Sequence, residues 1–111
     1  MIDNWIEASQ LSEHDIQHRS FQVAEFWAIT PADKIRLRLV TGMCWNPFVD
    51  ISQAMHLASL MSMNIVFGDK VVLVSEPAGA QSRTVAYELS GRVSAMQSAI
   101  TLLAADCYEN I

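Results

Sequence analysis

A turn followed at once by a capped helix constrains this chain more than any other feature. Asn46-Pro47 makes the turn, because proline fixes its own φ and pushes the preceding residue out of the helical region. Asp50 is placed to cap a new helix, and Gln53 is placed to reach back to the backbone nitrogen of that cap. The segment therefore predicts a connection into a helix and supplies no catalytic group.

Capping signals predict two helices before this turn. Ser12, which is followed by acidic residues, is placed to cap the first of them. Thr30 and Pro31 start the second, because a hydroxyl cap precedes proline at the first helical position. Gly42 ends this second helix.

The second helix carries an ambiguous apolar pattern. Ile35 and Leu39 lie at i and i+4, which predicts an apolar helical stripe, but apolar and basic residues also alternate here, which suits a strand equally well. The proline and the cap favour the helix. Lys34, Arg36 and Arg38 form the one basic cluster of the sequence. In a helix the three spread across an arc and form a solvated face, whereas in a strand they share one face that is able to meet an acidic partner or a phosphate.

The hydrophobic period changes after residue 62. Segments 63–67 and 71–75 are rich in β-branched residues, and the Gly-Asp-Lys between them predicts a tight hairpin. A third strand is predicted over 83–90, and helical spacing over 93–107 predicts a closing helix that starts at Ser94 or as early as Ser90. The predicted class is α+β, with helices packed on a small antiparallel β-meander in the order α-α-α-β-β-β-α.

The composition of the first 29 residues divides the chain into two predicted parts. Residues 1–29 form a helical N-terminal arm, which holds two of the three tryptophans and two of the three histidines, and residues 30–111 form an α+β sandwich domain. The sequence leaves open whether the arm packs on its own chain or exchanges between chains.

Charge and apolar content narrow the classes of partner. The formal net charge of −5, from 12 acidic and 7 basic residues, argues against nucleic acid and anionic membranes as partners, because both require a basic surface. No apolar run approaches the ~20 residues that span a bilayer. The N-terminus lacks a signal-peptide pattern, so we expect a cytoplasmic protein without a membrane partner.

Cys44 and Cys107 are expected to be buried free thiols.

A block in the middle of the chain resembles a known family. The matching residues are Asn46, Pro47, Asp50 and Ala54, the last within the capped helix. Together with the hairpin, the further strand and the alanine-rich closing helix, they resemble the small phage and prophage proteins of the phage α-β-α (ABA) sandwich domain type. The resemblance covers about residues 44–107, and Phe48-Val49 departs from the small hydroxylated pair common in that family. It implies a phage or prophage origin and an intracellular setting, and it brings no catalytic residues.

The sequence predicts no cofactor and no metal. His14 and His18 lie at i and i+4, so on a helix both imidazoles project from one face and, with Asp15 or Glu13, are able to begin a zinc or nickel site. Solvent-exposed polar positions explain the pair equally well, and no third ligand is evident.

One candidate function depends on a pocket near His56, Cys44 and Trp45. Such a pocket would make the chain a small-ligand-binding protein or an enzyme, as the alternative to a protein that binds other proteins. A nucleophilic thiol needs an activating base or a helix N-terminus, and structural packing explains both His56 and Cys44 as well. A structural virion or assembly component is a further alternative.

Protein–protein binding without catalysis is the predicted function. The chain would be a phage or prophage accessory protein that engages a host or phage protein, for example to inhibit a host defence system. The predicted partner-binding residues are Trp5, Phe21, Phe26, Trp27, Arg36 and Arg38. Aromatic residues are enriched in binding hot spots, although an arm folded back onto the domain explains them equally well. A homodimer through the same apolar surface is compatible with this function.

Overall fold

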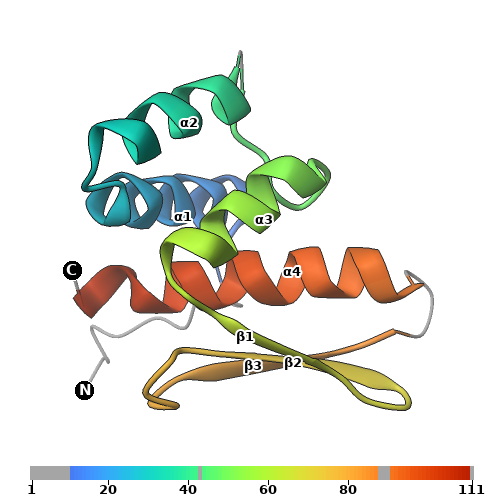
Figure 1. Cartoon of the computed structure of the whole chain (residues 1–111). Coiled ribbons are helices and arrows are strands. Elements are labelled where there is room, and N and C mark those ends of the chain that lie inside the picture. Colours follow the sequence, from blue (N-terminus) through green and yellow to red (C-terminus); the bar gives the residue numbers. More distant parts are fainter. Residues whose placement is uncertain (1–10, 43, 88–90, 111) are drawn as a thin grey trace, which may run out of the picture.

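The predicted order of elements, α-α-α-β-β-β-α, is present in the computed structural model, which describes residues 11–42, 44–87 and 91–110 (Figure 1). The helices are α1 (Glu13–Trp27), α2 (Pro31–Thr41), α3 (Ile51–Leu60) and α4 (Gly91–Asp106), followed by a short 3₁₀ helix, η2 (Cys107–Asn110). The strands are β1 (Asn64–Phe67), β2 (Val71–Ser75) and β3 (Ser82–Ala86). The prediction of an α+β fold is therefore confirmed.

The helix caps form at the predicted residues. The side-chain oxygens of Ser12, Thr30 and Asp50 each accept a hydrogen bond from a backbone N–H in the first turn of the following helix. Gly42, with φ of +54°, follows the last residue of α2, at a conformation that glycine adopts without strain. Segment 31–41 is thus a helix, and the strand alternative is wrong.

The Gln53 side chain does not reach back to the cap nitrogen, and that prediction is wrong. Its Oε1 accepts a hydrogen bond from the Asn46 N–H at 2.6 Å, and its Nε2 donates to the carbonyls of Val40 and Cys44 at 2.7 and 2.8 Å. The Asp50 N–H donates instead to the Asn46 carbonyl. Through these hydrogen bonds, Gln53 joins the end of α2 to the start of α3.

Helix α4 is the central element of the fold. It lies between the sheet on one side and the other helices on the other side (Figure 1). Nine of its residues are buried, which is expected of a helix covered on several faces. Met96, Ile100 and Leu103, which lie at helical spacing, are buried, whereas Val93 is exposed. The helix begins at Gly91, so the predicted start at Ser94 is wrong, and residue 90 lies outside the described residues.

The sheet has the antiparallel order β1-β2-β3. Val72 and Val74 are fully buried beneath α4, while their neighbours Val71 and Leu73 point to the opposite face and are exposed. All the described helices lie on the inner face of the sheet (Figure 1). β3 ends at Ala86, earlier than predicted, and residues 88–90 of the expected strand lie outside the described part of the chain.

Helix α1 packs against α4 of the same chain and buries Ile16, Val23 and Ala24. The division into an arm (1–29) and a domain (30–111) stays a prediction. Within the described ranges, every helix is too short or too polar to cross a membrane.

Candidate functional site

Helix α2 is the helix farthest from the sheet, and much of its surface faces solvent (Figure 1). Leu37 is its one buried residue, with Val40 half-buried one turn later, whereas Ile35 and Leu39 are 56% and 70% exposed. The apolar stripe predicted from Ile35 and Leu39 therefore faces outward. A helix that alternates apolar and basic residues has apolar side chains on opposite sides, so the pattern does not identify the side that packs.

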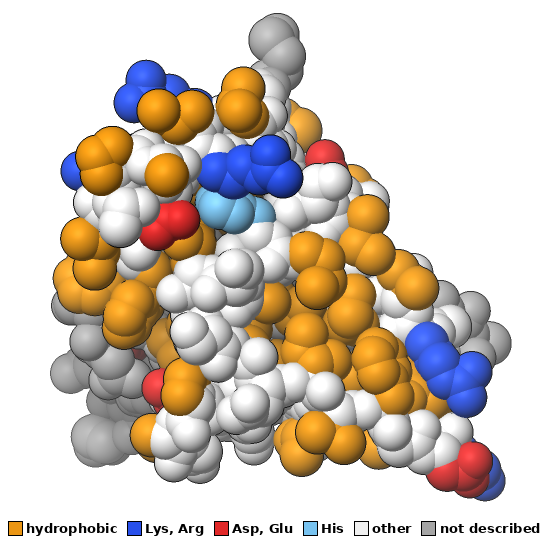
Figure 2. All heavy atoms as spheres, viewed as in Figure 1, with side chains coloured by type: hydrophobic (Ala, Val, Ile, Leu, Met, Phe, Trp, Pro, Cys, Tyr) orange, Lys and Arg blue, Asp and Glu red, His pale blue; other side chains and the backbone are white. Residues whose placement is uncertain are grey.

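The exposed side of α2 is also basic. Three of the seven basic residues of the chain lie on it, namely Lys34, Arg36 and Arg38. None of the three makes an ion pair with any residue in the described ranges. Figure 2 shows basic and hydrophobic side chains interleaved over this helix. We call the surface formed by these three cations together with Ile35 and Leu39 the α2 ridge.

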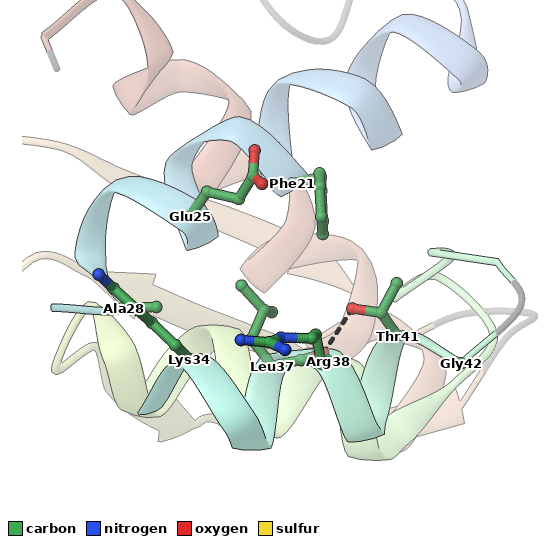
Figure 3. Close-up of a pocket in the computed structure, with 8 residues that line it drawn as sticks. All are labelled: Phe21, Glu25, Ala28, Lys34, Leu37, Arg38, Thr41 and Gly42. Atoms are coloured by element: carbon green, nitrogen blue, oxygen red, sulfur yellow. Dashed lines mark hydrogen bonds between the residues drawn. The ribbon is translucent and has the colours of Figure 1, made fainter. Parts of the chain in front are cut away.

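A cleft of about 330 Å³ lies on one flank of the ridge, between α1 and α2 (Figure 3). The residues that line it are Phe21, Glu25 and Ala28 from the α1 side and Lys34, Leu37, Arg38, Thr41 and Gly42 from the α2 side. Phe21 is braced by an edge-to-face contact with Trp45, at 5.4 Å between ring centroids. The Thr41 hydroxyl donates to the Leu37 carbonyl at 2.6 Å, so it is engaged within its own helix. Apolar and charged side chains are therefore presented together in this cleft.

A wider groove of about 770 Å³ lies on the other flank, between α2 and α3. The residues that line it are Arg36, Leu39 and Val40 from α2 and Asp50, Ile51, Ser52, Met55, His56 and Ser59 from the α3 side. Ile51 and Met55 are 45% and 43% exposed, so α3 adds apolar surface to that of Leu39. Both flanks of the ridge are therefore hollowed.

His56 lies in this groove with its Nε2 buried and without a hydrogen-bond partner in the described structure. Burial is the largest effect and lowers the pKa of its imidazole, and the charge of Arg36 also lowers this pKa. Asp33 raises the pKa through its charge and through a backbone hydrogen bond, but the net shift is downward. The side chain is therefore neutral at pH 7. Cys44 is not among the groove residues, so the groove does not bring His56 and Cys44 together as the alternative function would require.

The two thiols differ in their environments. Cys44 is exposed, so the prediction that both thiols are buried is wrong for this residue; its place in the irregular connection between α2 and α3 leaves it uncovered. Cys107 is buried and lies 3.0 Å from the Oε1 of Gln81, to which its Sγ donates. Burial raises the pKa of Cys107 to about 12, and the carboxylates of Glu76 and Asp106 act in the same direction.

One thiol in each native chain should therefore react with a disulfide exchange reagent such as Ellman's reagent. The thiolate is the reactive form, and Cys44 is exposed to the reagent, whereas burial both covers Cys107 and raises its pKa to about 12. Two thiols should react after unfolding in guanidinium, and Cys44→Ser should leave none reactive in the native chain. Rapid reaction of two thiols in the native protein would contradict the burial of Cys107.

The structure brings together two of the predicted partner-binding residues. Phe21 and Arg38 line the α1–α2 cleft, whereas Arg36 lies across the ridge in the α2–α3 groove. Sequence reasoning did not assign Lys34 to the site. Its position four residues before Arg38 is the signal that places both cations on one flank of a helix.

Phe26 and Trp27, two further aromatic residues of the prediction, line neither hollow. Phe26 and Trp27 stack edge to face at the C-terminal end of α1, with ring centroids 5.5 Å apart, and are 52% and 40% exposed. Trp5 lies outside the described residues. The six predicted residues therefore do not form one continuous surface in the part of the chain that the structure describes.

The described residues hold no group of three or more histidine, cysteine, aspartate or glutamate side chains arranged to bind a metal ion. His14 and His18 are exposed and line a shallow hollow beside Phe21 and Trp45. Comparison of the chain with family models, with curated proteins and with solved structures finds no match.

Proposed function

We propose that this protein is a non-enzymatic binding module that captures an acidic protein partner on the α2 ridge. The observation that carries the proposal is the local reversal of charge. Lys34, Arg36 and Arg38 together with Asp33 give α2 a formal charge of +2, so the rest of the chain carries −7. A basic surface on an acidic protein attracts an acidic partner to that surface and repels it elsewhere.

The apolar part of the ridge supplies the binding free energy that exposed charges alone do not. Ile35 and Leu39 lie one turn apart and expose more than half of their side-chain surface. Burying such side chains at the centre of an interface, with charges at the rim, is the usual arrangement of a binding hot spot. The ridge combines both elements on one rigid helix.

The resemblance to phage ABA sandwich proteins suggests the setting for this activity. In this setting the partner is a cytoplasmic protein, either of a bacterial host or of the phage. Binding covers a surface that the partner needs for its own function. Inhibition of a host defence system is one such outcome. This part of the proposal is supported by the resemblance over about residues 44–107, whereas the binding surface is supported by the geometry of α2.

Affinity capture from a bacterial lysate tests the proposal when wild type and a ridge variant are compared. The bait variant Arg36→Glu/Arg38→Glu reverses two ridge charges at exposed positions, so the fold should be retained. We expect a protein that is enriched by the wild type to be recovered at least about tenfold less by the variant, which corresponds to about 1.4 kcal/mol. Mass spectrometry against a tag-only bait measures the ratio.

The matched control is Lys70→Glu/Arg92→Glu, which makes the same charge change at exposed positions remote from α2. The control should capture the partner as well as the wild type does. Equal recovery by the ridge variant and the wild type would remove the ridge from the binding surface. Circular dichroism of all baits establishes that they are folded.

A further inference from the structure

The dimensions of the α1–α2 cleft indicate what shape of partner it accepts. Its lining extends from Phe21 to Ala28 along α1 and from Lys34 to Thr41 along α2. Each wall spans seven residue steps, or about 10 Å at 1.5 Å per step, which is the length of two turns of an α-helix. The cleft is thus long enough for two turns of a helix, with Leu37 between its walls (Figure 3).

The apolar part of this cleft is suited to close approach. Leu37 and Ala28 are 6% and 2% exposed, and Phe21 closes the end opposite Lys34 and Ala28 (Figure 3). The small side chain of Ala28 at one end and the half-buried ring of Phe21 at the other leave room between them for an apolar residue of a partner. Such a pocket takes residues spaced at i, i+3 or i+4 and i+7 on a docked amphipathic helix.

The charges of the cleft differ between its two walls. Lys34 and Arg38 lie on the α2 wall, four residues and about 6 Å apart. Glu25 lies on the α1 wall with its carboxylate directed away from α2 (Figure 3), and it makes no ion pair within the described ranges. A bound segment therefore meets cations along one side and a carboxylate along the other.

We infer that the α1–α2 cleft is the docking site for an amphipathic helix of the partner that carries two acidic residues at i and i+4. The acidic pair faces Lys34 and Arg38, and the flank toward Glu25 is neutral or basic. The apolar stripe lies against the half-buried ring of Phe21, over the closed floor that Leu37 and Ala28 form. This inference rests on the proposed function and specifies the part of the partner that is recognised.

A helix fits this site better than an extended segment does. An extended peptide that adds to the edge of a sheet gains affinity from main-chain hydrogen bonds with that edge. Both walls of the cleft are helices, whose interior backbone groups are already paired within the helix. A helical segment satisfies its own backbone groups and needs only side-chain contacts.

Selection from a displayed library of helical peptides against the immobilised full-length protein tests the inference. In the library, the flanking and apolar positions of a two-turn helix are varied on a constant alanine-rich scaffold. We expect enrichment of aspartate or glutamate at two positions four residues apart, beside leucine, isoleucine or phenylalanine on the adjacent stripe. Enrichment of basic residues there, or of no consensus, would overturn the inference.

A charge exchange locates the selected peptide in the cleft. Lys34→Glu/Arg38→Glu should weaken binding of the acidic peptide at least tenfold and should strengthen binding of the same peptide with lysine at both acidic positions. Lys70→Glu/Arg92→Glu makes the same charge change at exposed positions remote from α2 and serves as the matched control, with less than a threefold effect. A peptide that binds all three proteins equally would contradict docking in this cleft.

These outcomes separate the inference from the proposed function. If Arg36→Glu/Arg38→Glu loses the captured partner while the library yields no acidic consensus, the ridge binds a partner of another shape and the inference fails alone. If the acidic peptide docks in the cleft but no captured protein depends on the ridge charges, the cleft is a helix site and the proposed function fails.

Discussion

Gln53→Leu should lower the free energy of unfolding by about 3–5 kcal/mol, although leucine matches glutamine closely in size. Gln53 is 2% exposed, and its side chain pairs the Asn46 N–H and the carbonyls of Val40 and Cys44. Each backbone group left without a partner away from water costs about 1–3 kcal/mol. Because leucine offers no polar atom, all three groups lose their partner at once. Urea unfolding followed by circular dichroism measures the change.

Gln97→Leu is the matched control for this substitution. Gln97 is also a buried glutamine on a helix, but among the described residues its side chain makes one long hydrogen bond, from Nε2 to the Pro47 carbonyl at 3.3 Å. We expect this variant to lose about 1 kcal/mol. Equal effects of the two substitutions would show that the connection between α2 and α3 does not depend on Gln53.

Ile100→Ala should lower the free energy of unfolding by about 3–4 kcal/mol. Ile100 is fully buried in α4, so removing its outer carbons loses apolar burial and leaves a cavity that the neighbouring layers fill only partly. A loss of that size is a large share of the ~5–15 kcal/mol that stabilises a typical domain. The variant should therefore unfold at a markedly lower urea concentration.

Val93→Ala on the same helix separates burial from helix propensity. Val93 is 53% exposed, and alanine is the better helix former, so we expect a change within about 0.5 kcal/mol. A large loss at Val93 would contradict the burial pattern of α4. A small loss at Ile100 would mean that the layers on either side of α4 close over the missing atoms.

Local signals account for the part of the fold that the sequence predicts well. The caps at Ser12, Thr30 and Asp50 depend on hydrogen bonds within one turn, so their residue types are sufficient to identify them. The hairpin is equally local, since the Gly68 N–H donates to the Val71 carbonyl at 2.7 Å. The order of the helices and strands follows from such signals.

Features that depend on distant packing are not predictable in this way. The side of α2 that packs is decided by contact with α1 and α3, and this contact buries Leu37 rather than Ile35 or Leu39. For the same reason Arg36 and Arg38, two residues apart in the sequence, line different hollows. The partners of Gln53 lie in a connection whose path no short-range pattern specifies.

The central position of α4 affects how the chain folds during synthesis. It is the last long helix of the described chain, and the ribosome adds 20 residues, 87–106, between the last residue of the sheet and the end of this helix. At about 5–20 residues per second, this takes about 1–4 s. During that time the inner faces of α1, α3 and the sheet lack the helix that separates them. The nascent chain therefore exposes the apolar surface that α4 later covers, and binding by a chaperone in this interval would protect it from aggregation.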